Sequence, residues 1–371
     1  MRIAFCNRPD YDNPLGGDAI QMLKTKHYLE INYSVIIDII TDPMEITSKY
    51  SIVHVFNFIT YKISKKFIKR ANMYGIPVVS SPIYWDYSYA STSKLFYLIG
   101  YPNHLNEFTI NILKNIVKML GNFTLKPIGV SSTFKRNAKW MYEKSDFVAP
   151  NSLEEANLFL DWINKKDTSN KIRIVYNATD ITDNQTITPI SENLFHANYG
   201  IPKDYILQVG RIEFCKNQLN LIAALKENSE IPIVFIGKII DLSYYKKLKK
   251  LADKRGNVYF IDAVSHSEIS SFFRFAKLHV LLSLRESPGL VNIEALSNGC
   301  PIVISDKRFL PVNTYFSNQP YIVNPLNISE VKDIILNAYK NCVIPPFNFE
   351  KFSWNTVSKQ TYNIYKEILR K

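Results

Sequence analysis

Residues 283–301 read SLRESPGLVNIEALSNGCP. An apolar strand ends near Leu284, a helix opens at Ser287 or Pro288, and Gly299 ends that helix before the next apolar run. This order places the loop between strand and helix at the carboxyl edge of a parallel sheet, where open α/β sheets bind ligands. The stretch therefore predicts an α/β fold and a ligand site in the same loop.

The same alternation of strands and helices extends outward in both directions. Apolar runs of strand length and amphipathic stretches alternate in the first half of the chain over residues 2–6, 19–29, 34–40, 52–56, 63–73 and 78–80. The pattern restarts at Tyr205 and is typical of parallel sheets covered by helices. We expect one α/β domain over residues 1–176, a polar linker over 177–204 and a second α/β domain over 205–350. Residues 354–371 are expected to form a C-terminal helix.

Length and composition narrow the class of protein. The 371 residues, 46% of them hydrophobic, suffice for two cores of roughly 150 residues each. No apolar run approaches the ~20 residues of a membrane-spanning helix, and the N-terminus lacks the apolar region of a signal peptide. We therefore expect a cytoplasmic protein. The four cysteines form no CxxC pair, which argues against a disulfide framework or a structural zinc site.

Positive charge is concentrated in one part of the chain. Residues 51–150 carry 13 Lys and Arg against 4 Asp and Glu, which accounts for +9 of the net charge of +12. These cations are interleaved with aromatic residues, and the set comprises Lys114, Lys118, Lys126, Lys135, Arg136 and Lys139 with Phe108, Phe123, Phe134 and Trp140. The composition favours an anionic membrane surface. Nucleic acid would also fit the charge, and a solvated basic face that binds nothing is the alternative.

The loop at residues 286–291 has the features of an anion site. Backbone N–H groups of Gly289, Leu290 and Val291 at a helix start favour a phosphate, and Gly289 allows close approach. Glu286 precedes the helix and Glu294 lies within it, so two carboxylates flank the expected phosphate, and each can accept hydrogen bonds from vicinal hydroxyls. The alternative is that Glu286 only caps the helix and Glu294 is a solvated helix residue.

A second group of residues opens the same domain. Gly210 ends a strand, and Arg211 and Lys216 follow it in the loop before the next helix. An arginine fork and a mobile lysine are a common pair on a diphosphate leaving group. Alone, two loop cations would be weak evidence for a site, but together with the two glutamates they form a specific pattern.

At this point the sequence resembles the retaining GT-B glycosyltransferases of family 4 over nearly its whole length. The resemblance is carried by Gly16-Gly17, the stretches 150–155 and 175–180, Gly210-Arg211, Lys216-Asn217, Glu286 to Glu294 and residues 352–354. It implies two Rossmann-like domains facing a cleft, with the nucleotide sugar held mainly by the second domain. It also implies that the C-terminal helix crosses back to the first domain.

The same resemblance implies roles for individual residues. Arg211 and Lys216 would bind the diphosphate, Glu286 the hydroxyls of the donor sugar, and Glu294 the ribose. Gly17 would lie under the phosphate or sugar from the first domain.

One departure from the family pattern concerns the acceptor side. Many members have a histidine beside the reacting carbon, whereas residues 77–86 read PVVSSPIYWD here. His54 lies on a neighbouring apolar strand, where a histidine is more often a core residue. Tyr84, Trp85 and Asp86 are better acceptor-side candidates, because aromatic faces stack on sugars and a carboxylate orients a hydroxyl. A packed surface loop is the alternative.

These observations lead to one functional hypothesis. We expect a metal-independent, retaining glycosyltransferase that moves a sugar from a nucleoside diphosphate to an acceptor hydroxyl. Arg211, Lys216 and the helix start would stabilise the leaving diphosphate, and no Asp-x-Asp motif typical of metal-dependent transferases appears in a plausible loop. We expect no cofactor and no nucleic-acid partner. The expected acceptor is a glycan or lipid-linked glycan of a bacterial surface, reached from the inner face of the plasma membrane.

Other classes of protein remain as alternatives. A non-enzymatic nucleotide-sugar sensor or partner subunit is favoured only by the missing histidine. A dehydrogenase is disfavoured because Gly16-Gly17 is not a G-x-G-x-x-G fingerprint. A phosphorylase or an epimerase of related fold would need lysine or acid/base motifs that the chain does not show.

Overall fold

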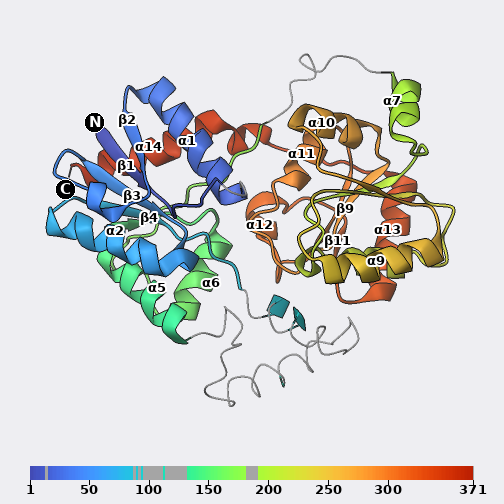
Figure 1. Cartoon of the computed structure of the whole chain (residues 1–371), viewed down its shortest axis with the longest axis horizontal. Helices are drawn as coiled ribbons and strands as arrows, with labels where there is room; N and C mark the ends of the chain where they lie inside the picture. The colour runs from blue at the N-terminus through green and yellow to red at the C-terminus, as the bar shows by residue number, and fades with distance from the viewer. Residues whose placement is uncertain are drawn as a thin grey trace. The chain divides into compact units, whose positions relative to one another are not determined.

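The computed structural model describes residues 1–12, 16–86, 89–90, 93–94, 112, 132–180 and 191–370 (Figure 1). The described chain forms two compact units. Unit 1 contains residues 1–86, 132–179 and 350–370, and unit 2 contains residues 180 and 191–349 together with the short described pieces from 89 to 112. Within the described residues, no helix has the length and apolar character needed to cross a membrane.

Unit 1 is built on a five-stranded parallel sheet of order β2-β1-β3-β4-β5. Its strands are β1 (Arg2–Cys6), β2 (Ile36–Ile40), β3 (Ile52–Phe56), β4 (Val78–Ser81) and β5 (Phe147–Val148). Every residue of β3 is buried, as expected for a central strand covered on both faces.

The helices of unit 1 come from both ends of the chain. They are α1 (Gly17–Tyr33), α2 (Tyr61–Met73), α5 (Ser132–Lys144), α6 (Leu153–Ile163) and α14 (Trp354–Ile368), with short 3₁₀ turns at Pro43–Glu45, Phe58–Thr60 and Phe349–Phe352. Helix α14 packs beside α1, whereas α2 packs on α5 and α5 on α6 (Figure 1).

The C-terminal helix belongs to unit 1. Ile364, Tyr365 and Ile368 are buried in the core with residues of β1 and β3. Arg173 also donates a hydrogen bond of 2.9 Å to Glu367. The helix therefore joins the first α/β unit, as the resemblance implied.

Unit 2 contains a six-stranded parallel sheet of order β11-β10-β9-β6-β7-β8. Its strands are β6 (Ile206–Val209), β7 (Ile233–Ile236), β8 (Val258–Ile261), β9 (Leu278–Leu281), β10 (Ile302–Ser305) and β11 (Ile322–Val323). Its helices are α7 (Glu192–Tyr199), α8 (Gln218–Ala224), α9 (Leu242–Arg255), α10 (His266–Phe275), α11 (Val291–Ser297), α12 (Val312–Tyr315) and α13 (Ile328–Asn341), with a 3₁₀ turn at Phe214–Lys216. The expected pair of parallel α/β units is confirmed.

Part of the expected linker is helical. Ser191 caps α7 by accepting a hydrogen bond from the N–H of Leu194. Phe195 is buried, with its ring centroid 4.8 Å from that of Phe272. The range 177–204 therefore includes a helix packed on unit 2, while residues 181–190 lie outside the described part of the chain.

The strand order reverses once in each sheet. In unit 1, β2 and β3 flank β1, and in unit 2, β7 and β9 flank β6. The helices that follow the two strands at a reversal leave on opposite faces of the sheet, so a crevice remains at the carboxyl ends of those strands. The reversals lie between β1 and β3 and between β6 and β9.

Two loops at the edge of unit 2 approach each other closely at glycines. Gly237 has a φ of +147°, and a Cβ built there would overlap the carbonyl oxygen of Gly210. Gly299 also has a positive φ of +74°, but a Cβ there would meet open space. Comparing a substitution at Gly237 with one at Gly299 therefore separates the cost of backbone strain from the cost of steric overlap.

We expect Gly237→Ala to lower the free energy of unfolding by about 2 kcal/mol more than Gly299→Ala. Both substitutions incur backbone strain of ~1–3 kcal/mol, and only the first adds overlap with backbone atoms. Urea unfolding of the two variants measures the difference. Equal losses of unfolding free energy in the two variants would show that the loops at Gly210 and Gly237 move apart at little cost to accommodate the added Cβ.

Candidate functional site

In unit 2 the predicted residues gather at the reversal between β6 and β9. These two strands pair in parallel, so the loops that follow them emerge side by side. The N–H of Leu284 donates a hydrogen bond of 2.8 Å to the carbonyl of Cys215 and thereby joins the two loops. Lys216 from the first loop and Glu286 from the second are brought together.

Lys216 and Glu286 form an ion pair between the Nζ and Oε1 atoms. Only 16% and 11% of their side chains are exposed. The hydroxyl of Ser283 donates a second hydrogen bond, of 2.7 Å, to the same oxygen of Glu286, while the amide of Gln208 donates one to the carbonyl of Lys216. The two residues predicted to hold the diphosphate and the sugar are thus fixed against each other.

Arg211 stands apart from that ion pair. Its side chain is 56% exposed, and its guanidinium contacts the carboxylate of Glu213 at 2.8 Å. An exposed pair of this kind is weak, so the arginine can exchange its partner for an anionic ligand.

The loop before α11 is shaped by Gly289. Its φ is +80°, and a Cβ there would lie 3.1 Å from Nδ2 of Asn292 and 3.4 Å from Cγ of Glu286. Among the described residues, none accepts a hydrogen bond from the N–H of Gly289, Leu290 or Val291. These donors are the ones predicted for an anion, although α11 is only seven residues long.

Glu294 is placed on α11 as predicted. Its side chain is partly buried. Its carbonyl accepts hydrogen bonds from the N–H of Asn298 and the hydroxyl of Ser297, which tighten the end of this short helix.

A buried histidine lies beneath this site and was not predicted. His279 on β9 is fully buried and accepts a 3.4 Å hydrogen bond from the N–H of Val209. Burial lowers the pKa of His279 to about 3, so the ring is neutral at pH 7. The sequence signal was a single polar residue within the apolar run of a central strand.

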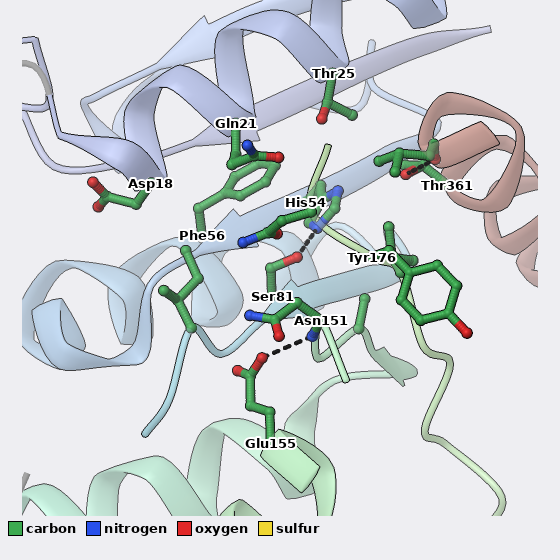
Figure 2. A pocket seen from close by; sticks show the side chains of 15 residues that line it. Asp18, Gln21, Thr25, His54, Phe56, Ser81, Asn151, Glu155, Tyr176 and Thr361 are labelled. Carbon is green, nitrogen blue, oxygen red and sulfur yellow. Dashed lines mark hydrogen bonds between the residues drawn. The ribbon is translucent and has the colours of Figure 1, made fainter. Parts of the chain in front are cut away.

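Unit 1 contains a pocket at its own reversal of strand order (Figure 2). Its walls come from α1, the carboxyl ends of β3, β4 and β5, the start of α6, the segment 175–177 and helix α14. The lining residues are Asp18, Gln21, Thr25, His54, Phe56, Ser81, Ile83, Ala149, Asn151, Glu155, Val175, Tyr176, Asn177, Val357 and Thr361.

His54 is held rigidly in this pocket. Its Nε2 lies 2.9 Å from the hydroxyl of Ser81 (Figure 2), and its Nδ1 lies 2.6 Å from the hydroxyl of Tyr365. Burial lowers the pKa of His54 to about 3. The residue is therefore a neutral, hydrogen-bonded part of the core that also lines the pocket.

Glu155 forms the opposite wall and holds two backbone segments. Its two carboxylate oxygens accept hydrogen bonds of 2.7 Å from the N–H groups of Tyr84 and Asn151. Ser152 caps α6 by accepting a bond from the N–H of Glu155. Burial raises the pKa of Glu155 to about 7, against the opposing effect of the two backbone donors.

The structure does not support the acceptor-side role predicted for Tyr84 and Trp85. Their exposed fractions are 3% and 2%, and Tyr84 stacks on Trp162 at 4.7 Å. Both aromatic rings are occupied by the core, so neither face is open to a sugar. Asp86 is partly exposed. Gly17 begins α1, and a Cβ there would meet open space.

Cations cover two neighbouring helices of unit 1, which we call the basic face. Helix α2 has five Lys and Arg and no acidic residue, and α5 has four with one glutamate. The basic face comprises Lys62, Lys65, Lys66, Lys69, Arg70, Lys135, Arg136, Lys139 and Lys144. Lys65 lies over the ring of Trp140. The expected cations Lys114, Lys118 and Lys126 and the aromatic residues Phe108 and Phe123 lie outside the described residues.

No cluster of three or more metal-binding side chains occurs in the part of the chain that the structure describes.

Comparison with protein families supports the predicted resemblance. Residues 192–342 match the family model described as glycosyl transferases group 1. This range includes Arg211, Lys216, Glu286, Gly289 and Glu294, and thus the whole candidate site of unit 2.

Curated relatives match part of the chain. An uncharacterized glycosyltransferase of Methanocaldococcus jannaschii is 25% identical over 212 residues, covering 53% of this chain and 54% of that protein. A D-inositol 3-phosphate glycosyltransferase of Mycobacterium tuberculosis is 27% identical over 182 residues, covering 47% and 37%. The chain spans about half the length of the curated relatives it matches.

Solved structures match the whole chain. Sucrose-phosphate synthase from Thermosynechococcus elongatus has a TM-score of 0.72 at 14% identity, covering 100% of this chain and 99% of that one. Anabaena HepE in complex with UDP and glucose has a TM-score of 0.64 at 15% identity, covering 100% and 95%. At these identities the likeness establishes the fold, which is GT-B.

We expect Lys216 and Glu286 to be strongly coupled. Lys216→Met and Glu286→Gln should each destabilise the protein, and the double variant should lose less than the sum by about 0.5–3 kcal/mol, because neither charge is then left unpaired. Urea unfolding of the four proteins measures this coupling. The exposed pair Lys332 and Glu227, 2.8 Å apart, is the control and should show little. Additive losses at Lys216 and Glu286 would show that the two charges do not stabilise each other.

The raised pKa of Glu155 predicts a pH-dependent stability. The folded protein holds this proton up to a pH of about 7, whereas the unfolded chain releases it near 4.5. The contribution is full below pH 4.5 and is lost as the pH rises to about 7, by on the order of 3 kcal/mol. Unfolding between pH 5 and 8 should show this loss in the wild type and in Glu154→Gln, but not in Glu155→Gln. An unchanged slope in Glu155→Gln would assign the effect to another group.

Proposed function

We propose that this chain is a glycosyltransferase that transfers a sugar from a nucleoside diphosphate sugar to an acceptor hydroxyl, with retention at the anomeric carbon. The observation that carries the proposal is the meeting of Lys216, Glu286 and the Gly289 loop at the reversal of unit 2. This site lies wholly within the range that matches group 1 glycosyl transferases, and Anabaena HepE, which has the same fold, is described with UDP and glucose.

The donor would be held by opposite charges on the two loops. Lys216 and the exposed Arg211 supply the positive charge for the diphosphate, while the N–H groups from Gly289 to Val291 supply neutral donors. Glu286 would accept hydrogen bonds from the sugar hydroxyls, and Glu294 from the ribose. Lys216 and Glu286 form an ion pair with each other. A bound donor would replace this contact, with its diphosphate on Lys216 and its sugar hydroxyls on Glu286.

The reaction requires control of charge. The bond between the anomeric carbon and the phosphate oxygen breaks, and negative charge grows on the diphosphate beside Lys216 and Arg211. A bond then forms from the acceptor oxygen to the anomeric carbon on the same face, and the proton of that hydroxyl passes to the departing phosphate. These cations provide electrostatic stabilisation without a metal in the proposed mechanism.

We also propose that the enzyme works on surface glycans or glycolipids as a peripheral protein at the cytoplasmic face of a membrane. The basic face supports this, since α2 and α5 together carry nine cations and one acidic residue. Each basic residue near an anionic leaflet contributes about 1 kcal/mol. Trp140 and Tyr61 lie among the cations, as is common at lipid interfaces.

Donor turnover tests the central proposal. One of UDP, GDP, dTDP or ADP should raise the thermal transition, because a ligand of the native state stabilises it, and the matching sugar donor should be hydrolysed or transferred. Arg211→Ala should lower that turnover by about 10²–10³, whereas Arg274→Ala on α10 should leave it unchanged. Nucleotide binding without turnover of any donor would favour the sensor instead.

Liposome sedimentation tests the membrane proposal. Replacing five cations of the basic face by Gln should remove most binding to anionic vesicles while leaving nucleotide binding intact. The five are Lys62, Lys66, Lys69, Arg136 and Lys139. Wild-type binding should also fall with salt, as the Debye length shrinks from ~10 Å at 0.1 M to ~3 Å at 1 M.

The matched control removes five exposed lysines of α9 in unit 2, which are Lys246, Lys247, Lys249, Lys250 and Lys254. This variant should sediment as the wild type does. Equal losses in both variants would show that total charge and not the basic face decides binding.

A further inference from the structure

The pocket of unit 1 has a composition that restricts its ligand. It lies at the carboxyl ends of β3 and β4, beside the reversal of strand order, where α/β sheets bind ligands. Figure 2 shows Asp18 and Gln21 on one wall, from α1, and Asn151 and Glu155 on the other. Polar oxygens and amides therefore surround the space from two sides.

No cation lines this pocket among the described residues. Its ionisable groups are Asp18, His54, Glu155 and the phenol of Tyr176, and His54 is neutral because it is buried between two hydroxyls. The pocket is therefore neutral to negative at pH 7.

Two cations lie near the pocket without being part of its lining. Lys351 lies over the ring of Tyr176, with its Nζ 4.7 Å from the ring centroid, and Arg8 is paired with carboxylates. Arg8 contacts Asp18 at 3.3 Å and Asp10 at 3.2 Å, so its charge is matched by two carboxylates. The same oxygen of Asp18 also accepts a 3.1 Å hydrogen bond from the amide of Asn57. Asp18 is thus held in position at the pocket wall with only 15% of its side chain exposed.

This charge distribution distinguishes between two kinds of acceptor. A phosphate group needs cations or several N–H donors, and close to Asp18 it would be repelled by a like charge in a partly desolvated site. An uncharged hydroxyl group can donate to a carboxylate and to the hydroxyl oxygen of Thr361, whose own proton is donated to the carbonyl of Val357.

We propose that this pocket binds an uncharged, hydroxyl-bearing part of the acceptor and discriminates against sugar phosphates, with Asp18 as the residue that sets this specificity. The inference rests on the proposed function, because it assigns the acceptor class of that enzyme. It separates this chain from matched proteins whose descriptions name phosphorylated compounds, such as D-inositol 3-phosphate and glucose-6-phosphate.

Ligand-observed NMR on the full chain tests the proposal without a donor. The probes are the methyl α-pyranosides of glucose, galactose and mannose, compared with glucose 6-phosphate and mannose 6-phosphate. At least one neutral glycoside should bind at least tenfold more tightly than either phosphate. Asp18→Asn should weaken the neutral probe and strengthen the phosphates, so that the ratio falls at least fivefold.

Asp10→Asn is the matched control. It removes the other carboxylate that contacts Arg8, but Asp10 does not line the pocket and 73% of its side chain is exposed. This variant should keep the wild-type ratio. Identical ratios in Asp18→Asn and the wild type would place the sugar elsewhere, and if Asp18→Asn fails to fold, the wild-type comparison alone still decides.

Three outcomes overturn the inference: phosphates that bind as tightly as neutral glycosides, binding of no neutral glycoside, or equal effects of the two variants. Each is independent of the donor experiment. Donor turnover with preferred transfer to sugar phosphates would support the proposed glycosyltransferase activity and contradict the proposed neutral acceptor. Selective binding of a neutral glycoside without donor turnover would support the proposed specificity of the pocket and contradict the proposed glycosyltransferase activity.

Discussion

The reversal of strand order beside the first strand of each sheet determines where the chain can hold a ligand. In unit 2, Lys216 follows β6 and Glu286 comes in the loop after β9, so two residues 70 positions apart form one partly buried ion pair. In unit 1, the reversal between β1 and β3 leaves the pocket of Asp18 and Ser81. The chemistry of both units therefore follows from strand order, because parallel strands bring their carboxyl ends to the same edge.

The two sites differ in charge. Unit 2 combines a partly buried ion pair with the half-exposed side chain of Arg211 and with the N–H groups from Gly289 to Val291, which have no hydrogen-bond acceptor within the described residues. This combination suits a diphosphate. The unit 1 pocket has carboxylates and neutral groups without a lining cation in the described chain, even though α2 and α5 of the same unit are strongly basic. The net charge of a domain therefore does not indicate the charge of its pocket. Side chains at particular strand ends decide it.

Sequence patterns predicted what depends on local spacing. The alternation of strands and helices gave both units, and the loops after β6 and β9 could be recognised from glycines and helix starts. Contacts between distant segments were not accessible in this way. Tyr84 was expected beside an acceptor, but its N–H is held by Glu155, 71 positions later, and its ring stacks on Trp162. The ion pair between Lys216 and Glu286 and the burial of His279 likewise depend on packing that periodicity does not specify.

The discontinuity of unit 1 has a consequence for biosynthesis. Its sheet comes from the first half of the chain, but Tyr365 of α14 fixes His54, and Thr361 closes the pocket wall. The ribosome must therefore complete residues 191–349 of unit 2 before the segment that seals unit 1 emerges. Domains generally fold as units while synthesis proceeds. The later unit in the sequence can thus reach its native state first, while the earlier one waits with part of its apolar surface uncovered and within reach of chaperones.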